Sequence, residues 1–87
     1  MTRTLVLAAA QLGPVARDEP KASVVERMVG LLRRAHRRGA TLVAFPELAL
    51  TTFFPRWWVE PLSAADHFYE TEMPGPATEP LFAEAAR

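Results

Sequence analysis

One carboxylate stands where an α/β enzyme would place a catalytic group. Glu47 follows an apolar run over residues 41–45 and comes directly after Phe45 and Pro46. Catalytic groups of α/β enzymes gather beyond the carboxyl ends of parallel strands, so Glu47 is a candidate catalytic residue. Its apolar neighbours also make it poorly placed for simple solvation. The spacing alone leaves open an alternative, in which the carboxylate caps a turn or pairs with an arginine.

The side chains that would complete such a site are missing from the sequence. The chain has no cysteine, which excludes disulfides and thiolate metal sites, and no serine–histidine arrangement. Its single lysine, Lys21, begins the first predicted helix, and we expect it near the opposite edge of the sheet from Glu47. His36 and His67 lack a second ligand at metal spacing, so they receive no role, and no metal or cofactor is predicted.

Other chemically capable side chains each have a structural alternative. Four arginines fall within residues 33–38. They form either a face for phosphate or a partner, or a solvated helix C-terminus favoured by the helix dipole, and we prefer the second interpretation. Trp57 and Trp58 either shape a substrate pocket or pack the loop that carries them, and Arg56 is a candidate for holding a substrate carboxylate.

The composition limits the class of protein. With 87 residues the chain is at most one small domain, and 49% hydrophobic residues argue against disorder. Ten basic and ten acidic residues cancel, which argues against a general nucleic-acid or membrane surface. No stretch approaches the roughly 18 apolar residues of a membrane span, and none is typical of a signal peptide. The expected location is cytoplasmic.

The hydrophobic pattern predicts a strand, a helix and a second strand. Residues 4–10 form a continuous apolar run, typical of a strand buried on both faces in a parallel sheet. Apolar residues then recur at helical spacing from Pro20 to Arg38, and Gly39 ends that helix. A second strand follows over residues 41–45. This order is the βαβ unit, whose strands are parallel, so the predicted class is α/β.

Details of the helix add two expectations. Asp18 or Glu19 places negative charge by the exposed N–H groups at its start. Gly30 lies in its interior at a cost of up to about 1 kcal/mol relative to alanine, which indicates close packing at that point.

The second half of the chain is less regular. Residues 48–62 are rich in aromatic side chains, and such a loop is expected to fold over something apolar or to line a pocket. Ser63 is expected to cap a short helix through about Tyr69, and Thr78 to cap a last helix. That helix reaches Arg87 without a stop signal, which predicts a truncated chain.

Three runs carry a resemblance to a known family. They are Ala44–Glu47 (Ala-Phe-Pro-Glu), Leu50–Trp57 (Leu-Thr-Thr-Phe-Phe-Pro-Arg-Trp) and Phe68–Pro76 (Phe-Tyr-Glu-Thr-Glu-Met-Pro-Gly-Pro). The first resembles the glutamate motif of the nitrilase superfamily, the carbon–nitrogen hydrolases. Together they resemble the N-carbamoyl-D-amino acid hydrolases within it. The likeness spans essentially all of residues 1–87, about the first third of such an enzyme.

The resemblance implies a four-layer α-β-β-α sandwich, of which residues 1–87 would be the N-terminal part of a single, truncated domain. It also implies a Glu–Lys–Cys catalytic set in which Glu47 takes the proton of the cysteine thiol. The thiolate attacks the carbamoyl carbon and ammonia leaves. Water then splits the carbamoyl-enzyme into carbon dioxide and the D-amino acid. The family's lysine and cysteine belong after Arg87. A free thiol has a pKa of about 8.5, so it needs a base at neutral pH, and a partly buried carboxylate suits that role.

Two classes of function follow from these patterns. The first is the N-terminal part of a hydrolase that acts on a small N-carbamoyl amino acid and is inactive without its remaining catalytic residues. The resemblance implies that the parent enzyme is a homo-oligomer, and neither nucleic acid nor membrane is an expected partner. The second is a binding or assembly module without chemistry. Within the superfamily, a β-ureidopropionase-like or aliphatic amidase-like enzyme is the other candidate.

Overall fold

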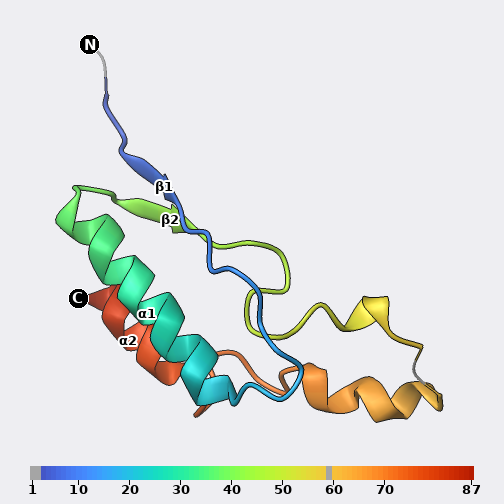
Figure 1. Ribbon diagram of the computed structural model, residues 1–87. Helices are drawn as coiled ribbons and strands as arrows, with labels where there is room; N and C mark the ends of the chain where they lie inside the picture. Colours follow the sequence, from blue (N-terminus) through green and yellow to red (C-terminus); the bar gives the residue numbers. More distant parts are fainter. Residues whose placement is uncertain (1–2, 59) are drawn as a thin grey trace.

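The βαβ unit predicted from the sequence is present. The computed structural model describes residues 3–58 and 60–87. Strand β1 (Leu7–Ala9) and strand β2 (Leu42–Ala44) pair in parallel, with Leu7 opposite Leu42, and helix α1 (Lys21–Arg37) connects them (Figure 1). The α/β class is therefore confirmed, and each strand is shorter than its apolar run.

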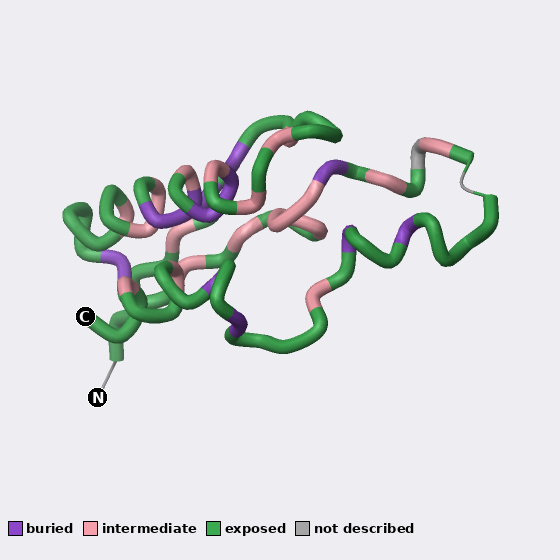
Figure 2. The backbone as a smooth tube through the Cα atoms, turned by 90° about the horizontal axis from the view of Figure 1, so that it is seen from below, coloured by how far each residue is buried: buried purple, intermediate pink, exposed green. Residues whose placement is uncertain are grey.

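Helix α1 begins and ends where its sequence predicts. Pro20 occupies the N-cap, where its missing N–H costs nothing. Gly39 follows the C-cap with φ +88°, a left-handed conformation that favours glycine. Four apolar residues on one side of the helix are buried (Figure 2): Val24, Val25, Met28 and Val29.

The expectation of close packing at Gly30 was wrong. The residue is exposed, and a Cβ built on it would meet no atom within 4 Å. The glycine therefore weakens the helix without a visible packing benefit.

A small core lies between α1 and the loops that follow the two strands. Leu12, Val24 and Met28 form its centre. Partly buried apolar side chains from α1 itself, the loop after β1, the segment after β2 and α2 pack against it: Val15, Leu31, Phe45, Ala49, Leu50 and Leu81. The core thus joins the loop after β1, the turn after β2 and the last helix to one face of α1.

The strands are not buried on both faces, so that expectation was wrong for this chain. Leu5 and Leu7 are each 62% exposed, and Leu42 is 57% exposed. The cause is geometric, because a sheet of two strands can be covered by one helix on only part of one face. Apolar surface that suits a sheet interior therefore faces solvent.

Helix α2 (Glu79–Ala86) begins at Thr78 as predicted, but the threonine side chain does not bond to the first helical turn. Instead the Gly75 N–H donates to Thr78 Oγ1 over 2.9 Å, and the Thr78 hydroxyl donates to the Gly75 carbonyl over 3.3 Å. Thr78 is fully buried. Its hydroxyl therefore fixes the preceding turn and sets the direction in which α2 leaves it.

One ion pair joins the two helices, which lie side by side (Figure 1). Arg33 donates from Nε to Glu84 Oε1 over 2.8 Å and from Nη2 to Oε2 over 3.2 Å. Arg87 adds a contact of 3.3 Å to the same carboxylate. The hydrogen bond from Arg33 lowers the pKa of Glu84, and Glu84 in turn raises the pKa of Arg33.

The aromatic segment forms an arm that extends from this body (Figure 1), in a molecule measuring 55 × 24 × 21 Å. Two 3-10 helices, Phe54–Arg56 and Leu62–Phe68, run along it. Phe54 stacks on Phe68 with ring centroids 4.9 Å apart, so the arm packs mainly on itself. The expectation that Ser63 caps the short helix was wrong, because Pro61 holds that position. Within the described residues, no helix is long and apolar enough to span a bilayer.

The two glycines of the α1 region provide a matched pair of substitutions. Gly39→Ala should destabilise the protein by about 1–2 kcal/mol, because an L side chain is strained at a left-handed φ. Gly30→Ala should stabilise it by up to about 1 kcal/mol through helix propensity. Urea unfolding followed by circular dichroism measures both changes. An equal effect of the two variants would contradict the assigned backbone conformations.

The interhelical ion pair predicts a pH-dependent stability. A carboxylate whose pKa is lowered by folding stabilises the folded state above its unfolded pKa, about 4.3, and that contribution is lost as pH falls through the folded value. Glu84→Gln should therefore lower Tm by about 1–5 °C at pH 7, and the difference should shrink below about pH 4. Glu26→Gln is the control, since Glu26 is exposed and forms no ion pair within the described residues. A Glu84→Gln effect independent of pH would contradict the assignment.

Candidate functional site

Glu47 lies just beyond the carboxyl end of β2, as the sequence predicts. It begins a turn over residues 47–50, in which Leu48 has a positive φ of 55°. The Thr51 N–H donates to the Leu48 carbonyl over 3.2 Å and closes the turn. A non-glycine residue with positive φ is uncommon, so neighbouring contacts must hold this turn in its conformation.

The carboxylate of Glu47 is solvent-exposed, which corrects the expectation of poor solvation. Within the described residues it accepts no hydrogen bond and forms no ion pair, so it is not a turn cap or an arginine partner here. Its apolar neighbour Phe45 turns toward the core and does not cover it. The described residues thus supply a free carboxylate on a fixed turn, but not the partial burial expected of a general base.

Contacts on both sides of Glu47 fix the turn to the body of the protein. Phe45 precedes it, and Ala49 and Leu50 follow it; all three pack against the core formed by Leu12, Val24 and Met28. The carboxylate is therefore the exposed tip of a segment whose flanks are anchored on the same apolar cluster.

The expectation that Lys21 lies near the opposite edge of the sheet from Glu47 was wrong. Helix α1 runs antiparallel to the two strands, so its first residue lies on the side where the strands end (Figure 1). Lys21 Nζ lies 2.6 Å from Glu70 Oε1 and forms an ion pair with it. That oxygen is buried and accepts no hydrogen bond from the described residues. This pair ties the start of α1 to the segment after the aromatic arm, so Lys21 is engaged there and not with Glu47.

The tryptophans of the aromatic arm have different environments. The guanidinium of Arg17 lies 4.9 Å from the ring centroid of Trp57, a cation–π contact between the first loop and the arm. Trp58 is 88% exposed and its indole N–H donates to Glu60 over 3.1 Å. The contacts of Trp57 agree with a packing role. The side chain of Arg56 lies outside the described part of the structure.

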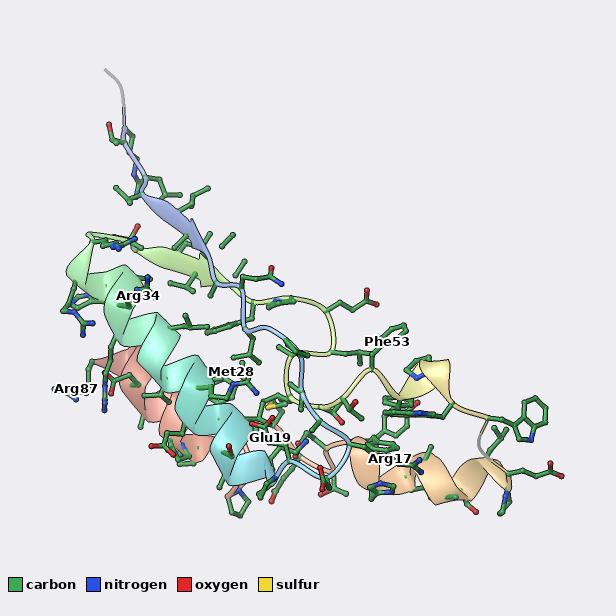
Figure 3. All side chains as sticks on the ribbon, viewed as in Figure 1. Arg17, Glu19, Met28, Arg34, Phe53 and Arg87 are labelled. Atoms are coloured by element: carbon green, nitrogen blue, oxygen red, sulfur yellow. The ribbon has the colours of Figure 1, made fainter. Side chains whose placement is uncertain are left out.

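The arginine cluster at the end of α1 does not form a single binding face. Arg33 turns to Glu84, whereas the other three arginines are exposed at the end of the helix. Arg34 and Arg87 lie at the far end of the helix pair from Glu19 (Figure 3). His67 packs on Phe68 with centroids 3.9 Å apart. Among the described residues, no three His, Cys, Asp or Glu side chains group in a way that could hold a metal ion.

Two hollows of the surface lie away from Glu47. A groove of about 930 Å³ runs between the C-terminal half of α1, β2 and α2. A smaller one of about 490 Å³ lies beside β1 and is also lined by Leu31 and Arg34. Glu47 lines neither of them.

One charged residue that the sequence does not single out, Arg27, binds the loop between β1 and α1. Arg27 lies on α1 among the other charged residues of its polar face, yet it binds a side chain and two carbonyls of the loop after β1. Its spacing in the sequence gives no signal of this, because the partners come from a loop without a periodic pattern.

Comparison with known protein families agrees with the resemblance of the sequence to the nitrilase superfamily. The family model described as carbon-nitrogen hydrolase matches residues 6–87. The match therefore includes both strands, both α-helices and the turn that carries Glu47. By its sequence, this chain belongs to the carbon–nitrogen hydrolases, the nitrilase superfamily.

Proposed function

We propose that residues 1–87 form the N-terminal part of a single carbon–nitrogen hydrolase domain that acts on N-carbamoyl-D-amino acids, with Glu47 as its general base. The observation that supports this most directly is the position of Glu47, a free carboxylate on an anchored turn at the carboxyl end of β2. The match of the carbon-nitrogen hydrolase model to residues 6–87 favours this proposal over a binding module without chemistry.

In the proposed reaction Glu47 takes the proton of a cysteine thiol that comes from outside residues 1–87. The thiolate attacks the carbamoyl carbon, and the terminal nitrogen of the carbamoyl group takes the proton back from Glu47 and leaves as ammonia. Water then hydrolyses the carbamoyl-enzyme to carbon dioxide and the free D-amino acid. A lysine from outside this chain stabilises the negative charge of the tetrahedral intermediates.

The remaining part of the domain must supply what the described residues lack. An exposed carboxylate becomes a better base when neighbouring residues cover it and the nucleophile lies within hydrogen-bond reach. The exposed faces of β1 and β2 are a surface on which such further layers could pack. We further propose that the enzyme is a cytoplasmic homo-oligomer that uses no cofactor.

Loss of the base should stop turnover while leaving the fold unchanged. In the hydrolase that contains this chain, Glu47→Gln should lower kcat by about 10²- to 10⁴-fold, because the amide keeps the shape of the side chain and removes its basicity. Circular dichroism and thermal unfolding should match the parent enzyme. Glu26→Gln, an exposed carboxylate on α1, is the control and should retain full activity. Turnover of Glu47→Gln near the parent level would show that Glu47 is not the base.

The substrate class is tested by a direct comparison of ureido acids. The same enzyme should release ammonia from N-carbamoyl-D-amino acids and do so much more slowly from the L-enantiomers. Simple aliphatic amides and N-carbamoyl-β-alanine serve as the competing substrates, because they represent the other amidase types of the superfamily. Preference for either competitor would reject the D-carbamoylase assignment and leave the hydrolase assignment intact.

A further inference from the structure

We propose that Arg27 is a positioning residue for the Glu47 turn, which it holds through the loop between β1 and α1. The catalytic part of this inference rests on the proposed role of Glu47, whereas the structural part does not. Arg27 contacts neither Glu47 nor a reacting group, so its effect on catalysis would pass through the packing between them.

The guanidinium of Arg27 joins three points of the loop. Nη1 donates to both carboxylate oxygens of Glu19, over 2.8 and 2.9 Å. Nη2 donates to the Leu12 carbonyl over 2.6 Å and to the Pro14 carbonyl over 3.1 Å. One side chain of α1 thus fixes both ends of the segment from Leu12 to Glu19.

We call the contacts of Arg27 with Leu12, Pro14 and Glu19 the clamp. The ion pair between Arg27 and Glu19 within it is partly shielded from water. The side chain of Glu19 is 16% exposed and also accepts a hydrogen bond from the Ser23 hydroxyl over 3.0 Å. The hydrogen bond from Arg27 is the main cause that lowers the pKa of Glu19. Glu19 is therefore ionised at neutral pH and holds Arg27 in the orientation in which its second nitrogen reaches the two carbonyls.

The core connects Leu12, which Arg27 binds, to the residues on both sides of Glu47. The backbone of Leu12 is bound by Arg27, and its side chain is buried in the core with Val24 and Met28. Phe45 and Leu50, on either side of Glu47, pack against that core. A shift of Leu12 therefore changes the surface on which the flanks of the Glu47 turn rest.

Arginine suits this role better than lysine. Its planar fork offers several N–H donors in fixed directions, so one group can bind a carboxylate and two carbonyls at once. A lysine ammonium at the same place would keep the charge interaction with Glu19 but could not span all three partners. Gly13, between the two carbonyls, has a φ of +81°, so the loop turns there in a conformation that favours glycine.

The test compares four variants of the hydrolase that contains this chain: Arg27→Ala, Arg27→Lys, Glu19→Gln and, as a control, Arg33→Ala. Arg33→Ala also breaks an arginine–glutamate pair, but at the α1–α2 contact. Steady-state kinetics give kcat and KM, and hydrogen exchange followed by mass spectrometry reports on residues 45–51. All measurements are made well below each variant's Tm, so that partial unfolding does not contribute.

Arg27→Ala should lower kcat by about 10- to 100-fold with KM nearly unchanged, and it should speed exchange at residues 45–51. Arg27→Lys and Glu19→Gln should give smaller effects in the same direction, and they provide the test if Arg27→Ala does not fold. Arg33→Ala should lower Tm without changing kcat or the hydrogen exchange of residues 45–51.

Unchanged kcat and unchanged exchange at residues 45–51 in all the clamp variants, with only a lower Tm, would overturn the proposal. Equal effects of Arg33→Ala and Arg27→Ala would overturn it as well, because they would indicate general destabilisation. Glu47→Gln separates the two proposals. If that variant remains active while Arg27→Ala still loosens the turn, the role of Glu47 as base is rejected and the clamp on the turn is supported.

Discussion

The arrangement of this chain depends on the contact between one face of α1 and Leu12. Val24, Met28 and Leu12 are the buried centre against which the loops after both strands and the last helix pack. Full burial of each such side chain contributes about 1.5–3 kcal/mol, so this small cluster is a large share of what can hold the unit together. The turn with Glu47 is closed by the hydrogen bond from Thr51 to Leu48 and takes its position from this cluster, against which its flanks pack.

Features fixed by local sequence could be predicted, and features that depend on distant surroundings could not. The limits of α1 follow from its apolar period, Pro20 and Gly39, because capping and propensity act within a few residues. The burial of β1 and β2 depends on what lies over the sheet, which no pattern within the strands can report. The place of Lys21 could have been predicted, because the helix of a βαβ unit runs antiparallel to its strands and begins on the side where they end.

The same distinction between local sequence and distant surroundings holds for the candidate site. Glu47 could be found from its position after an apolar run and from the motif around it, and the turn lies where that position implies. Its exposure could not be foreseen, since Phe45 turns inward and Pro46 leaves the carboxylate outside. Arg27 could not be recognised at all, because a charged residue on a polar helix face looks the same whether it faces water or binds a loop.

The bare apolar strands have a consequence for how this polypeptide behaves before and during folding. Leu5, Leu7 and Leu42 face solvent beside backbone edges that only one neighbour pairs. Such edges are templates for strands of other molecules, so intermolecular association competes with correct assembly and grows with concentration. The sheet that carries the Glu47 turn at its carboxyl end is thus also an edge at which further strands can pair.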